Sequence, residues 1–435
     1  MISTVILAGG EGSRFKPVNP SIPKCLFEVG GKTLLSRIID DLKTYKLDNI
    51  NIFTRLNTEV IKQYLNQNYK ELKIKVYKET KYKGTGAGLF EHIEKLEDTV
   101  LIIMSDLMMN VDLRKIINQH LQNSSKITLV CHPSSHMEDS DLVVINQNGQ
   151  VSEIKKQNSN KDYYDKNITM AGIVVLQKDV LSKILDEALI TKDNIDLTKD
   201  IVIKSLQINI PIDVYLTTEY IKDAGTPIRA KEVNDDLKQN YIFSNKNKKR
   251  PLVILDRDGT INEINGHIRS EQDIKLKAGV SESIRKLNDS GILVAVITNQ
   301  PVIARGECSE NKLKSIHNYL ELIINKESGG FFDEILYCPH YPESGFEGEV
   351  TELKIECLCR KPDIKLYEEI INKMDPDLNL LFAVGDSKTD VEAGHKVGAR
   401  TYLISNSLEE DISQADFNVS GLREAVDLIL EEVFK

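Results

Sequence analysis

Two carboxylates stand one residue apart near the middle of the chain, in the run PLVILDRDGT at 251–260. The apolar residues before Asp256 predict a short buried strand, and open α/β sheets bind their ligands at the carboxyl ends of such strands. Asp256 and Asp258 together can hold a divalent cation. One of them can also attack phosphorus while the other transfers protons. Taken alone, the pair could equally be an Asp-rich turn after a core strand.

Further polar residues follow later strand-like runs. The run 292–297 ends at Thr298, whose hydroxyl could donate to a phosphate oxygen. Lys361 precedes a predicted helix and could neutralise a carboxylate and a phosphoryl group together. The run 380–384 ends at Asp386, and Asp390 follows four residues later. These residues predict one phosphate and metal site at the edge of a sheet.

Three of the six cysteines lie close together with a histidine. Cys338 and His340 precede a loop that ends at Cys357 and Cys359. Three thiolates and an imidazole suit a closed tetrahedral zinc site, which we expect to be structural because no ligand position is left for water. The alternative is two turns with buried cysteines and a surface histidine.

A second group of candidate residues lies at the N-terminus, where strand-like residues 5–7 enter a glycine-rich loop. Glycines after a strand let backbone N–H groups approach phosphates, and Arg14 and Lys24 could neutralise a triphosphate. The loop lacks the spacing of a dinucleotide-binding loop and has no P-loop lysine. The residues expected to bind nucleotide here are Leu7, Ala8, Gly9, Gly10, Gly12, Ser13, Arg14 and Lys24.

Alternating strand-like and helix-like segments must position these groups. The chain of 435 residues is long enough for two or three domains. We predict an α/β domain at 1–235, a polar linker at 236–250 and a second α/β domain at 251–435. Predicted strands in the first domain are 4–8, 50–54, 74–77, 100–104 and 127–131. Predicted elements in the second domain are strands 252–255, 292–297, 334–337 and 380–384 and helices 280–289, 310–326, 364–374 and 390–396.

Composition and charge exclude several classes of protein. The net charge of −10 argues against a general binder of nucleic acid or anionic membranes. No apolar run approaches membrane-spanning length, and the N-terminus lacks a basic segment with a cleavage site. Six cysteines are too few for a disulfide scaffold. A cytoplasmic protein is expected, and a homo-oligomer is compatible with the sequence.

The N-terminal motifs resemble those of the sugar-1-phosphate nucleotidyltransferases, over roughly residues 1–230. The resemblance implies a Rossmann-like domain with a mixed sheet that transfers a nucleotidyl group from a nucleoside triphosphate to a sugar 1-phosphate and releases pyrophosphate. It makes Arg14 and Lys24 catalytic. It assigns nucleotide-base contacts to Gly84, Thr85 and Gly86, a sugar contact to Gly172, and Mg²⁺ binding to Asp106 and Asp223.

One segment departs from that family. Where the family often has Glu-Lys-Pro, this chain has Glu153-Ile154-Lys155-Lys156-Gln157. Lys156 is expected to contact the sugar phosphate. The departure leaves open which sugar is used.

The C-terminal motifs resemble those of the haloacid dehalogenase (HAD) superfamily of phosphatases, over about residues 251–430. The resemblance implies a Rossmannoid domain in which Asp256 is the nucleophile and Asp258 the general acid and base. Thr298 and Lys361 would hold the phosphoryl group. Asp256, the backbone carbonyl of Asp258 and Asp386 would bind Mg²⁺, with Asp390 in support.

The zinc-binding insert is similar to that of two HAD phosphatase families, which act on heptose bisphosphate and on histidinol phosphate. The segments 298–306 and 359–362 look closer to the heptose phosphatases. That likeness implies that Asn299, Arg305, Arg360 and Lys361 bind the substrate. The two arginines would grip the part of the doubly phosphorylated sugar that lies away from the reacting phosphate.

The two implied reactions are consecutive, because removing the distal phosphate of a heptose 1,7-bisphosphate leaves a sugar 1-phosphate. The expected substrates are therefore a sugar bisphosphate, a sugar 1-phosphate and a nucleoside triphosphate, with GTP favoured. CTP, UTP and dTTP, another phosphorylated sugar, or a domain that has lost its chemistry and serves regulation remain alternatives.

Overall fold

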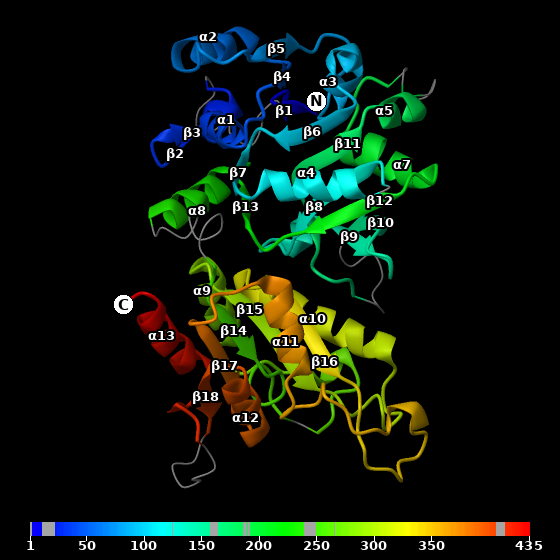
Figure 1. Ribbon diagram of the computed structural model, residues 1–435, viewed down its shortest axis with the longest axis vertical. Helices are drawn as coiled ribbons and strands as arrows, with labels where there is room; N and C mark the ends of the chain where they lie inside the picture. The colour runs from blue at the N-terminus through cyan, green and yellow to red at the C-terminus, as the bar shows by residue number, and fades with distance from the viewer. Residues whose placement is uncertain are drawn as a thin grey trace. The chain divides into compact units, whose positions relative to one another are not determined.

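The protein divides into two compact units in this computed structural model (Figure 1). Unit 1 contains Met1–His132, Val143–Lys155 and Ile168–Lys246, and unit 2 contains Pro133–Leu142, Lys156–Asn167 and Asn247–Lys435. The structure describes residues 2–10, 22–123, 125–156, 164–185, 189, 192–238, 249–264, 266–405 and 414–435. Most of the predicted linker lies outside the described residues, so the boundaries at 235 and 250 stay a prediction.

Unit 1 is built on a nine-stranded mixed sheet in the order β10-β9-β11-β6-β1-β4-β5, with β8 paired to β11 and β12 paired to β8. Strand β1 runs parallel to β4 and β6, whereas β11 runs antiparallel to β6 and β8. The strands are β1 (Ile2–Leu7), β4 (Ile50–Thr54), β5 (Lys75–Lys78), β6 (Thr99–Met104), β8 (Ile127–His132), β9 (Asp141–Ile145), β10 (Val151–Lys156), β11 (Thr169–Gln177) and β12 (Ile212–Leu216). Two small sheets join β7 (Leu107–Asn110) to β13 (Tyr220–Asp223) and β2 (Glu28–Val29) to β3 (Lys32–Thr33).

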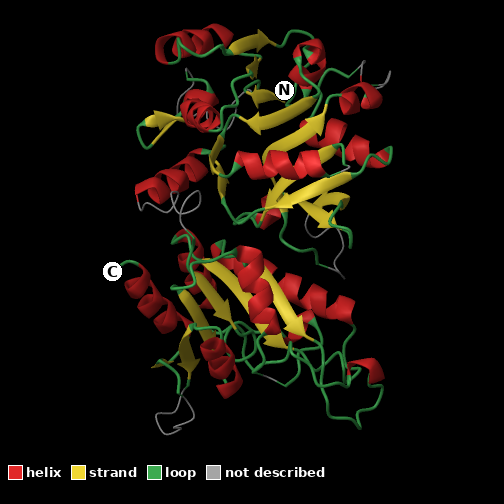
Figure 2. Ribbon diagram, viewed as in Figure 1, coloured by secondary structure: helices red, strands yellow, loops and turns green. Residues whose placement is uncertain are grey.

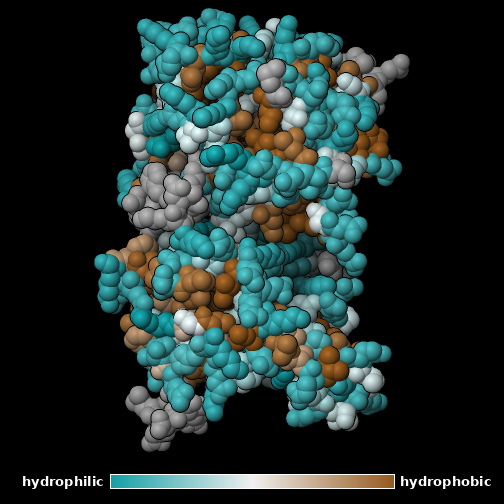
Figure 3. All heavy atoms as spheres, in the orientation of Figure 1, coloured by the Kyte–Doolittle hydropathy of each residue, from teal (hydrophilic) through white to brown (hydrophobic). Residues whose placement is uncertain are grey.

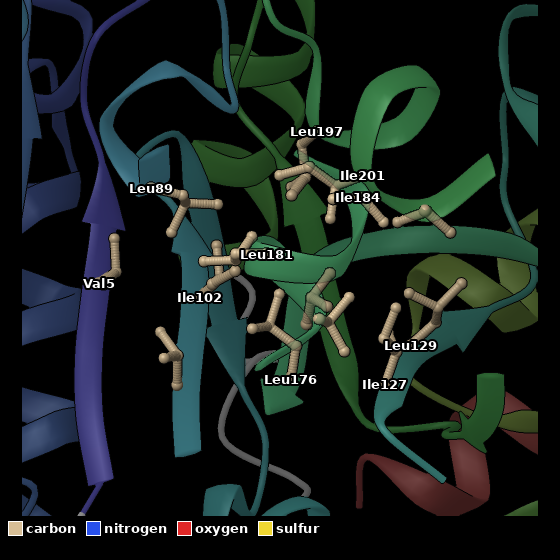
Figure 4. Packing of buried hydrophobic residues seen from close by; sticks show 14 of the residues in the cluster. Val5, Leu89, Ile102, Ile127, Leu129, Leu176, Leu181, Ile184, Leu197 and Ile201 are labelled. Atoms are coloured by element: carbon tan, nitrogen blue, oxygen red, sulfur yellow. The ribbon is translucent and has the colours of Figure 1, made fainter. Parts of the chain in front are cut away.

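Helices cover both faces of this sheet because alternate residues of each central strand point to opposite sides. On one face, Val5 and Ile102 pack with α3, α5 and the π-helical segment η4 (Figure 4). On the other face, Ile6 and Ile103 pack with α1, α2 and α4. The helical elements are α1 (Leu34–Thr44), α2 (Thr58–Asn68), α3 (Ala87–Glu91), α4 (Leu113–Gln122), α5 (Asp179–Ile184), η4 (Leu197–Ile203), α7 (Lys204–Gln207) and α8 (Pro227–Lys238).

Unit 2 is built on a six-stranded sheet in the order β16-β15-β14-β17-β18-β19, and every neighbouring pair in it is parallel. Strand β14 therefore lies between β15 and β17, and the carboxyl ends of all three strands meet at one edge. Ligands of open parallel sheets bind at such an edge. The strands are β14 (Leu252–Leu255), β15 (Leu293–Asn299), β16 (Glu334–Cys338), β17 (Leu381–Gly385), β18 (Arg400–Ile404) and β19 (Phe417–Val419).

The helices of unit 2 also cover both faces of their sheet (Figure 2). Val253 and Leu255 pack with α9, α10 and α13, whereas Leu252 and Ile254 pack with α11 and α12. Helix α10 begins after Ser309, whose side chain accepts from Lys312 N, and ends before Gly329, which has a left-handed conformation. The helices are α9 (Val280–Asp289), α10 (Glu310–Ser328), α11 (Lys365–Met374), α12 (Lys388–Lys396) and α13 (Leu422–Val433).

The face in Figure 3 is mostly hydrophilic, with hydrophobic residues gathered in smaller patches. Over the residues that the structure describes, no helix is both long and apolar enough to cross a membrane.

Candidate active sites and a candidate metal centre

Three carboxylates, two directly after neighbouring strands and one in the following helix, meet at the edge of the unit 2 sheet. Asp256 directly follows β14, Asp386 directly follows β17, and Asp390 lies in the first turn of α12. One carboxylate oxygen from each residue lies within 4.8 Å of the other two. Gly259 leaves the space that Asp386 fills, because a Cβ at Gly259 would overlap that carboxylate. The group fits a divalent cation that prefers oxygen ligands.

Lys361 holds two of these carboxylates together. Its Nζ lies 2.5 Å from Asp256 Oδ1 and 2.6 Å from Asp390 Oδ1, and it donates to the carbonyl of Ile297 at 2.7 Å. Burial raises the pKa of Asp256, and the neighbouring charge of Asp390 adds to this effect. The pKa of Lys361 is also raised, since its two carboxylate partners outweigh its burial. The lysine therefore stays charged beside the predicted nucleophile.

Residues at the end of β15 connect Thr298 to the rest of the site. Thr298 is buried, and its hydroxyl oxygen accepts from Gln300 Nε2 at 2.8 Å. Asn299 accepts from the backbone N–H of Lys361 at 3.0 Å and donates to the Lys361 carbonyl at 3.1 Å. Asn299 was predicted to bind the substrate. In the structure its amide holds the backbone of Lys361, and direct contact with a substrate stays a prediction.

The predicted general acid and base is held by an arginine between the two aspartates. Arg257 donates to both Asp258 oxygens, at 2.8 and 2.9 Å from Nη2, so the Asp258 carboxylate is paired and lies outside the three-carboxylate group. Burial raises the pKa of Asp258, but the charge of Arg257 and hydrogen bonds from Asn262 and Gln300 outweigh it and leave this pKa below its ordinary value.

A group of cations surrounds two aromatic rings beside this site. The guanidinium carbon of Arg305 lies 4.3 Å from the centre of the Tyr341 ring and 4.6 Å from that of Phe346. Lys354 lies 4.5 Å from the Phe346 ring, and Arg360 lies 5.2 Å from the Tyr341 ring. The two predicted arginines, Arg305 and Arg360, thus share one aromatic contact, which concentrates positive charge there.

The four predicted zinc ligands come together at the end of β16. Cys359 Sγ lies 3.2 Å from Cys338 Sγ, 3.4 Å from Cys357 Sγ and 3.1 Å from His340 Nδ1. All four ligand atoms lie within 4.8 Å of one another. Three sulfurs and one imidazole nitrogen at these separations fit a single tetrahedral ion.

In unit 1, the glycine-rich loop begins at the carboxyl end of β1. Ala8 donates its backbone N–H to the carbonyl of Phe53 at 2.8 Å, which ties the start of the loop to β4. A Cβ at Gly9 would overlap the carboxylate of Glu79. The predicted residues Gly12, Ser13 and Arg14 lie outside the described residues.

Glu79 is a buried carboxylate that was not predicted to belong to this site. It directly follows β5, is 3% exposed, and lies against Gly9 and Gly88. Among the described residues, its Oε2 has no hydrogen-bond partner. Burial raises the pKa of Glu79 to about 7. Its one sequence signal is an acidic residue at the end of a parallel strand.

The two predicted metal ligands of unit 1 converge at Gly225. A Cβ there would lie 2.7 Å from Asp223 Oδ1, 3.0 Å from Lys24 Nζ and 3.3 Å from Asp106 Oδ2. Lys24 forms an ion pair with Asp106. Arg229, in the first turn of α8, donates to both oxygens of Asp223 at 3.0 and 2.8 Å. The sequence pattern did not identify Arg229. Two carboxylates with two cations fit a site for Mg²⁺ and phosphates.

The predicted base-contacting segment is held in place by a neighbouring loop. Gly86 donates its backbone N–H to the carbonyl of Ile195 at 2.8 Å, and Thr85 donates its hydroxyl to Asp196 at 3.2 Å. Gly84 has a φ of +96° and packs so closely on Ile195 that a side chain would not fit. Gly172, also at positive φ, packs against Met104 and Leu107 next to Asp106. Lys156 ends β10, and its side chain lies outside the described set.

Comparison with known proteins agrees with both groups of motifs. Residues 3–240 match the family model described as nucleotidyl transferase, and residues 358–425 match the model described as HAD-hydrolase-like. The D-glycero-beta-D-manno-heptose-1,7-bisphosphate 7-phosphatase of Haemophilus ducreyi is 34% identical over 184 residues, covering 41% of this chain and 97% of the relative. The enzyme with the same name from Pseudomonas putida is 36% identical over 160 residues, covering 37% of this chain and 85% of that enzyme.

Solved structures resemble each unit separately. HddC from Yersinia pseudotuberculosis is 21% identical, with a TM-score of 0.46, and the match covers 55% of this chain and 100% of that one. The D,D-heptose 1,7-bisphosphate phosphatase from B. bronchiseptica is 28% identical, with a TM-score of 0.37, and the match covers 42% and 99%. The family-model and sequence matches make the chain an enzyme with a nucleotidyltransferase part and a phosphatase part. It belongs to the nucleotidyl transferase family through residues 3–240 and, over 184 aligned residues, to the family of these HAD-like 7-phosphatases.

Proposed function

We propose that the chain carries out two consecutive steps in the synthesis of a nucleotide-activated heptose. The phosphatase part removes the C7 phosphate of D-glycero-D-manno-heptose 1,7-bisphosphate. The nucleotidyltransferase part then transfers GMP from GTP to the resulting heptose 1-phosphate. The observation that supports this proposal is the presence of both sites on one chain, since the first produces the acceptor of the second. A nucleoside triphosphate substrate suits a cytoplasmic protein.

In the phosphatase reaction, an oxygen of Asp256 attacks phosphorus while the bond from phosphorus to the sugar oxygen breaks. The protonated form of Asp258, which the charge of Arg257 makes the minor form in the free protein, gives its proton to that oxygen, so the sugar leaves as an alcohol and an aspartyl-phosphate remains. Asp258 next takes a proton from water as the water oxygen attacks phosphorus, which regenerates Asp256 and releases phosphate. Lys361, 2.5 Å from Asp256, neutralises charge on the nucleophile and the phosphoryl group, and Thr298 donates to a phosphoryl oxygen.

Asp256 and Asp386, with the backbone carbonyl of Asp258, would hold Mg²⁺, which would neutralise phosphoryl charge and orient the phosphate. Asp390 is engaged by Lys361 and by the Ser387 hydroxyl at 2.6 Å, so we assign it a supporting role. The group of Cys338, His340, Cys357 and Cys359 would hold a structural zinc ion. This ion would fix the loop that leads into Arg360 and Lys361.

The cation group around Tyr341 supports a substrate with a second, unreacting phosphate. Arg305 and Arg360 both lie over this ring, and a doubly phosphorylated sugar places a second anion away from the reacting phosphorus. Planar guanidinium groups bind phosphate oxygens in pairs. We therefore assign the C1 phosphate to these arginines.

In the transferase reaction, an oxygen of the sugar 1-phosphate attacks the α-phosphorus of the nucleoside triphosphate. The bond from the α-phosphorus to the bridging oxygen breaks, and pyrophosphate leaves. Asp106 and Asp223 would hold Mg²⁺ there, and Lys24 would neutralise charge on the phosphates. Arg14 is assigned the same role from its motif.

The buried carboxylate of Glu79 supports guanine as the base. One edge of guanine presents two adjacent donors, N1–H and N2–H₂, which suit the two oxygens of a carboxylate. Adenine, cytosine, uracil and thymine present no such adjacent pair of donors. Burial raises the pKa of Glu79 to about 7, because the buried carboxylate lacks enough hydrogen-bond donors to stabilise its charge. Guanine would supply two such donors.

A substrate panel tests the proposal. The full chain receives the heptose 1,7-bisphosphate with each of GTP, ATP, CTP, UTP and dTTP, and free phosphate, pyrophosphate and nucleotide-sugar are measured. The expected result is one phosphate per sugar with every nucleotide and a nucleotide-sugar with GTP. Absence of phosphate release from the heptose substrate would refute the sugar assignment. A nucleotide-sugar formed equally well with CTP, UTP or dTTP would refute the base assignment.

A further inference from the structure

Arg257 is a fully buried charge in the middle of the phosphatase site. It is 1% exposed and, among the described residues, is the largest side chain that is fully buried. A buried guanidinium is stable only when its donors are satisfied. Arg257 donates to Asp258, to Gln300 Oε1 at 3.0 Å, and to His317 Nε2 at 3.0 Å. Three different segments of the chain therefore fix its orientation.

Gln300 contacts both Asp258 and the arginine that holds it. It accepts from Arg257 and donates to Asp258 Oδ2 at 2.8 Å and to the Thr298 hydroxyl oxygen at 2.8 Å. The direction in which Asp258 points thus depends on Arg257 and Gln300, together with Asn262, whose Nδ2 donates to Asp258 Oδ1 at 3.0 Å. If the guanidinium turned, the contacts of Arg257 and Gln300 would both change.

His317 binds a different nitrogen of Arg257, Nη1, from the Nη2 that contacts Asp258 and Gln300. It is 4% exposed and sits on α10, with its ring 5.5 Å from that of Tyr337 in an edge-on contact. Because arginine can only donate, His317 Nε2 must accept, and the ring proton must lie on Nδ1. A neutral histidine in this form supplies an acceptor without adding a charge.

We propose that His317 is a positioning residue of the phosphatase reaction: its Nε2 fixes the Arg257 guanidinium, which orients Asp258 for proton transfer. The inference rests on the proposed phosphatase mechanism. Asp258 must reach the leaving sugar oxygen when the aspartyl-phosphate forms and a water molecule when it is hydrolysed. Because His317 Nε2 accepts from Nη1 of Arg257, the guanidinium cannot rotate freely. The Asp258 carboxylate, which is bound to Nη2, therefore keeps its orientation. His317 itself touches no reacting atom.

The test uses p-nitrophenyl phosphate and the full chain with Mg²⁺. Its leaving group departs without a proton, so formation of the aspartyl-phosphate does not need Asp258, whereas hydrolysis does. In His317→Leu, which fills the space without an acceptor, the steady-state rate should fall about 10- to 100-fold, part of the 10²- to 10⁴-fold that acid–base catalysis supplies. The first turnover should stay near the wild-type rate and appear as a burst of about one p-nitrophenolate per chain.

Three further variants separate positioning from packing. His317→Gln places an amide oxygen near the Nε2 position and should restore most of the steady-state rate. His317→Asn is too short to do so and should behave as His317→Leu, which keeps the test valid if the leucine variant does not fold. Leu320→Val, a buried position one turn along α10, is the control for lost packing and should produce no burst.

A double-variant test asks whether His317 acts through Asp258. In an Asp258→Asn background, His317→Leu should add no further loss, since the group that it positions is gone. A wild-type rate in His317→Leu and His317→Asn, an equal loss of first turnover and steady state, or an additional loss in the Asp258→Asn background would each overturn the inference. If the unaltered chain releases no phosphate from any phosphomonoester, the proposed function fails instead.

Discussion

Glu79→Gln tests the assignment of the nucleotide base. The substitution keeps the volume of the side chain and one acceptor oxygen, but replaces the other oxygen with an amide that donates. In the wild-type structure, Oε2 has no partner among the described residues, and the backbone N–H of Gly88 contributes a hydrogen bond to the carboxylate. The variant can therefore accept only one of the two guanine donors that the carboxylate would accept.

The expected loss follows from one hydrogen bond to a charged group, which contributes about 1.5–3 kcal/mol. At about 1.4 kcal/mol per factor of ten, kcat/KM for GTP should fall about 10- to 150-fold. The rates with UTP, CTP and dTTP should change little, because these bases do not present two adjacent donors to the carboxylate. The discrimination between GTP and the pyrimidine nucleotides should therefore shrink by the same factor.

The assay is the initial rate of pyrophosphate release with heptose 1-phosphate held constant and each nucleoside triphosphate varied. Glu321→Gln is the matched control, because Glu321 is also 3% exposed and burial raises its pKa to about 7, but it lies in unit 2. This control should leave every nucleotide rate unchanged. An equal loss with all nucleotides in Glu79→Gln, or no loss with GTP, would refute the reasoning.

The same carboxylate predicts a dependence on pH. Burial raises the pKa of Glu79 to about 7 in the free protein, so the group gains a proton as the pH falls through 7. The protonated form cannot accept two hydrogen bonds, and kcat/KM for GTP should therefore fall by up to about tenfold per pH unit below this pKa. Glu79→Gln should lack this dependence. A wild-type profile for GTP that matches the profile of the variant would contradict the assignment.

Four other perturbations test the remaining assignments. Asp256→Asn should abolish phosphate release and leave nucleotidyl transfer intact, and Asp106→Ala should do the reverse; loss of both activities in either variant would argue against separate sites. Lys361→Met leaves the buried carboxylates of Asp256 and Asp390 without their cation, so the free energy of unfolding of unit 2, measured in urea, should fall by about 3–5 kcal/mol. Adding Asp390→Asn to this variant should recover part of the loss. Metal analysis should find about one zinc per chain, and a strong chelator should lower the melting temperature of the phosphatase unit; no bound zinc would remove the structural-zinc assignment.

Strongly patterned elements were predictable from the sequence. Strand β14 and helix α9 begin and end at the predicted residues, because an apolar run and a helical period leave little choice there. The predicted elements of the second domain end at residue 396, whereas the structure continues with β18, β19 and α13. The apolar spacing of α13 is detectable, but the short strand β19, with an exposed Phe417 and Asn418, has little signal of its own.

The candidate sites divide in a similar way. Asp256 and Asp386 lie together as the motif order implied, because the parallel strands β14 and β17 bring their carboxyl ends to one edge. Glu79 and His317 were not identified because their environment arises only from folding. His317 meets Arg257 across 60 residues of sequence, and nothing local marks either residue as buried. Asn299 is a residue that the motifs did identify, but its amide forms two hydrogen bonds with the backbone of Lys361 that no motif predicts.

The central place of β14 has a consequence for the order in which the protein is made. Leu252 pairs with Leu293 on one side and with Leu381 on the other, although β14 is the first strand of its sheet to leave the ribosome. At roughly 5–20 residues per second, β14 waits on the order of 6–25 s for its second partner. A chain released before Leu381 lacks Asp386 and Asp390 but contains the whole of residues 3–240. Interrupted synthesis would therefore favour transferase without phosphatase, and never the converse.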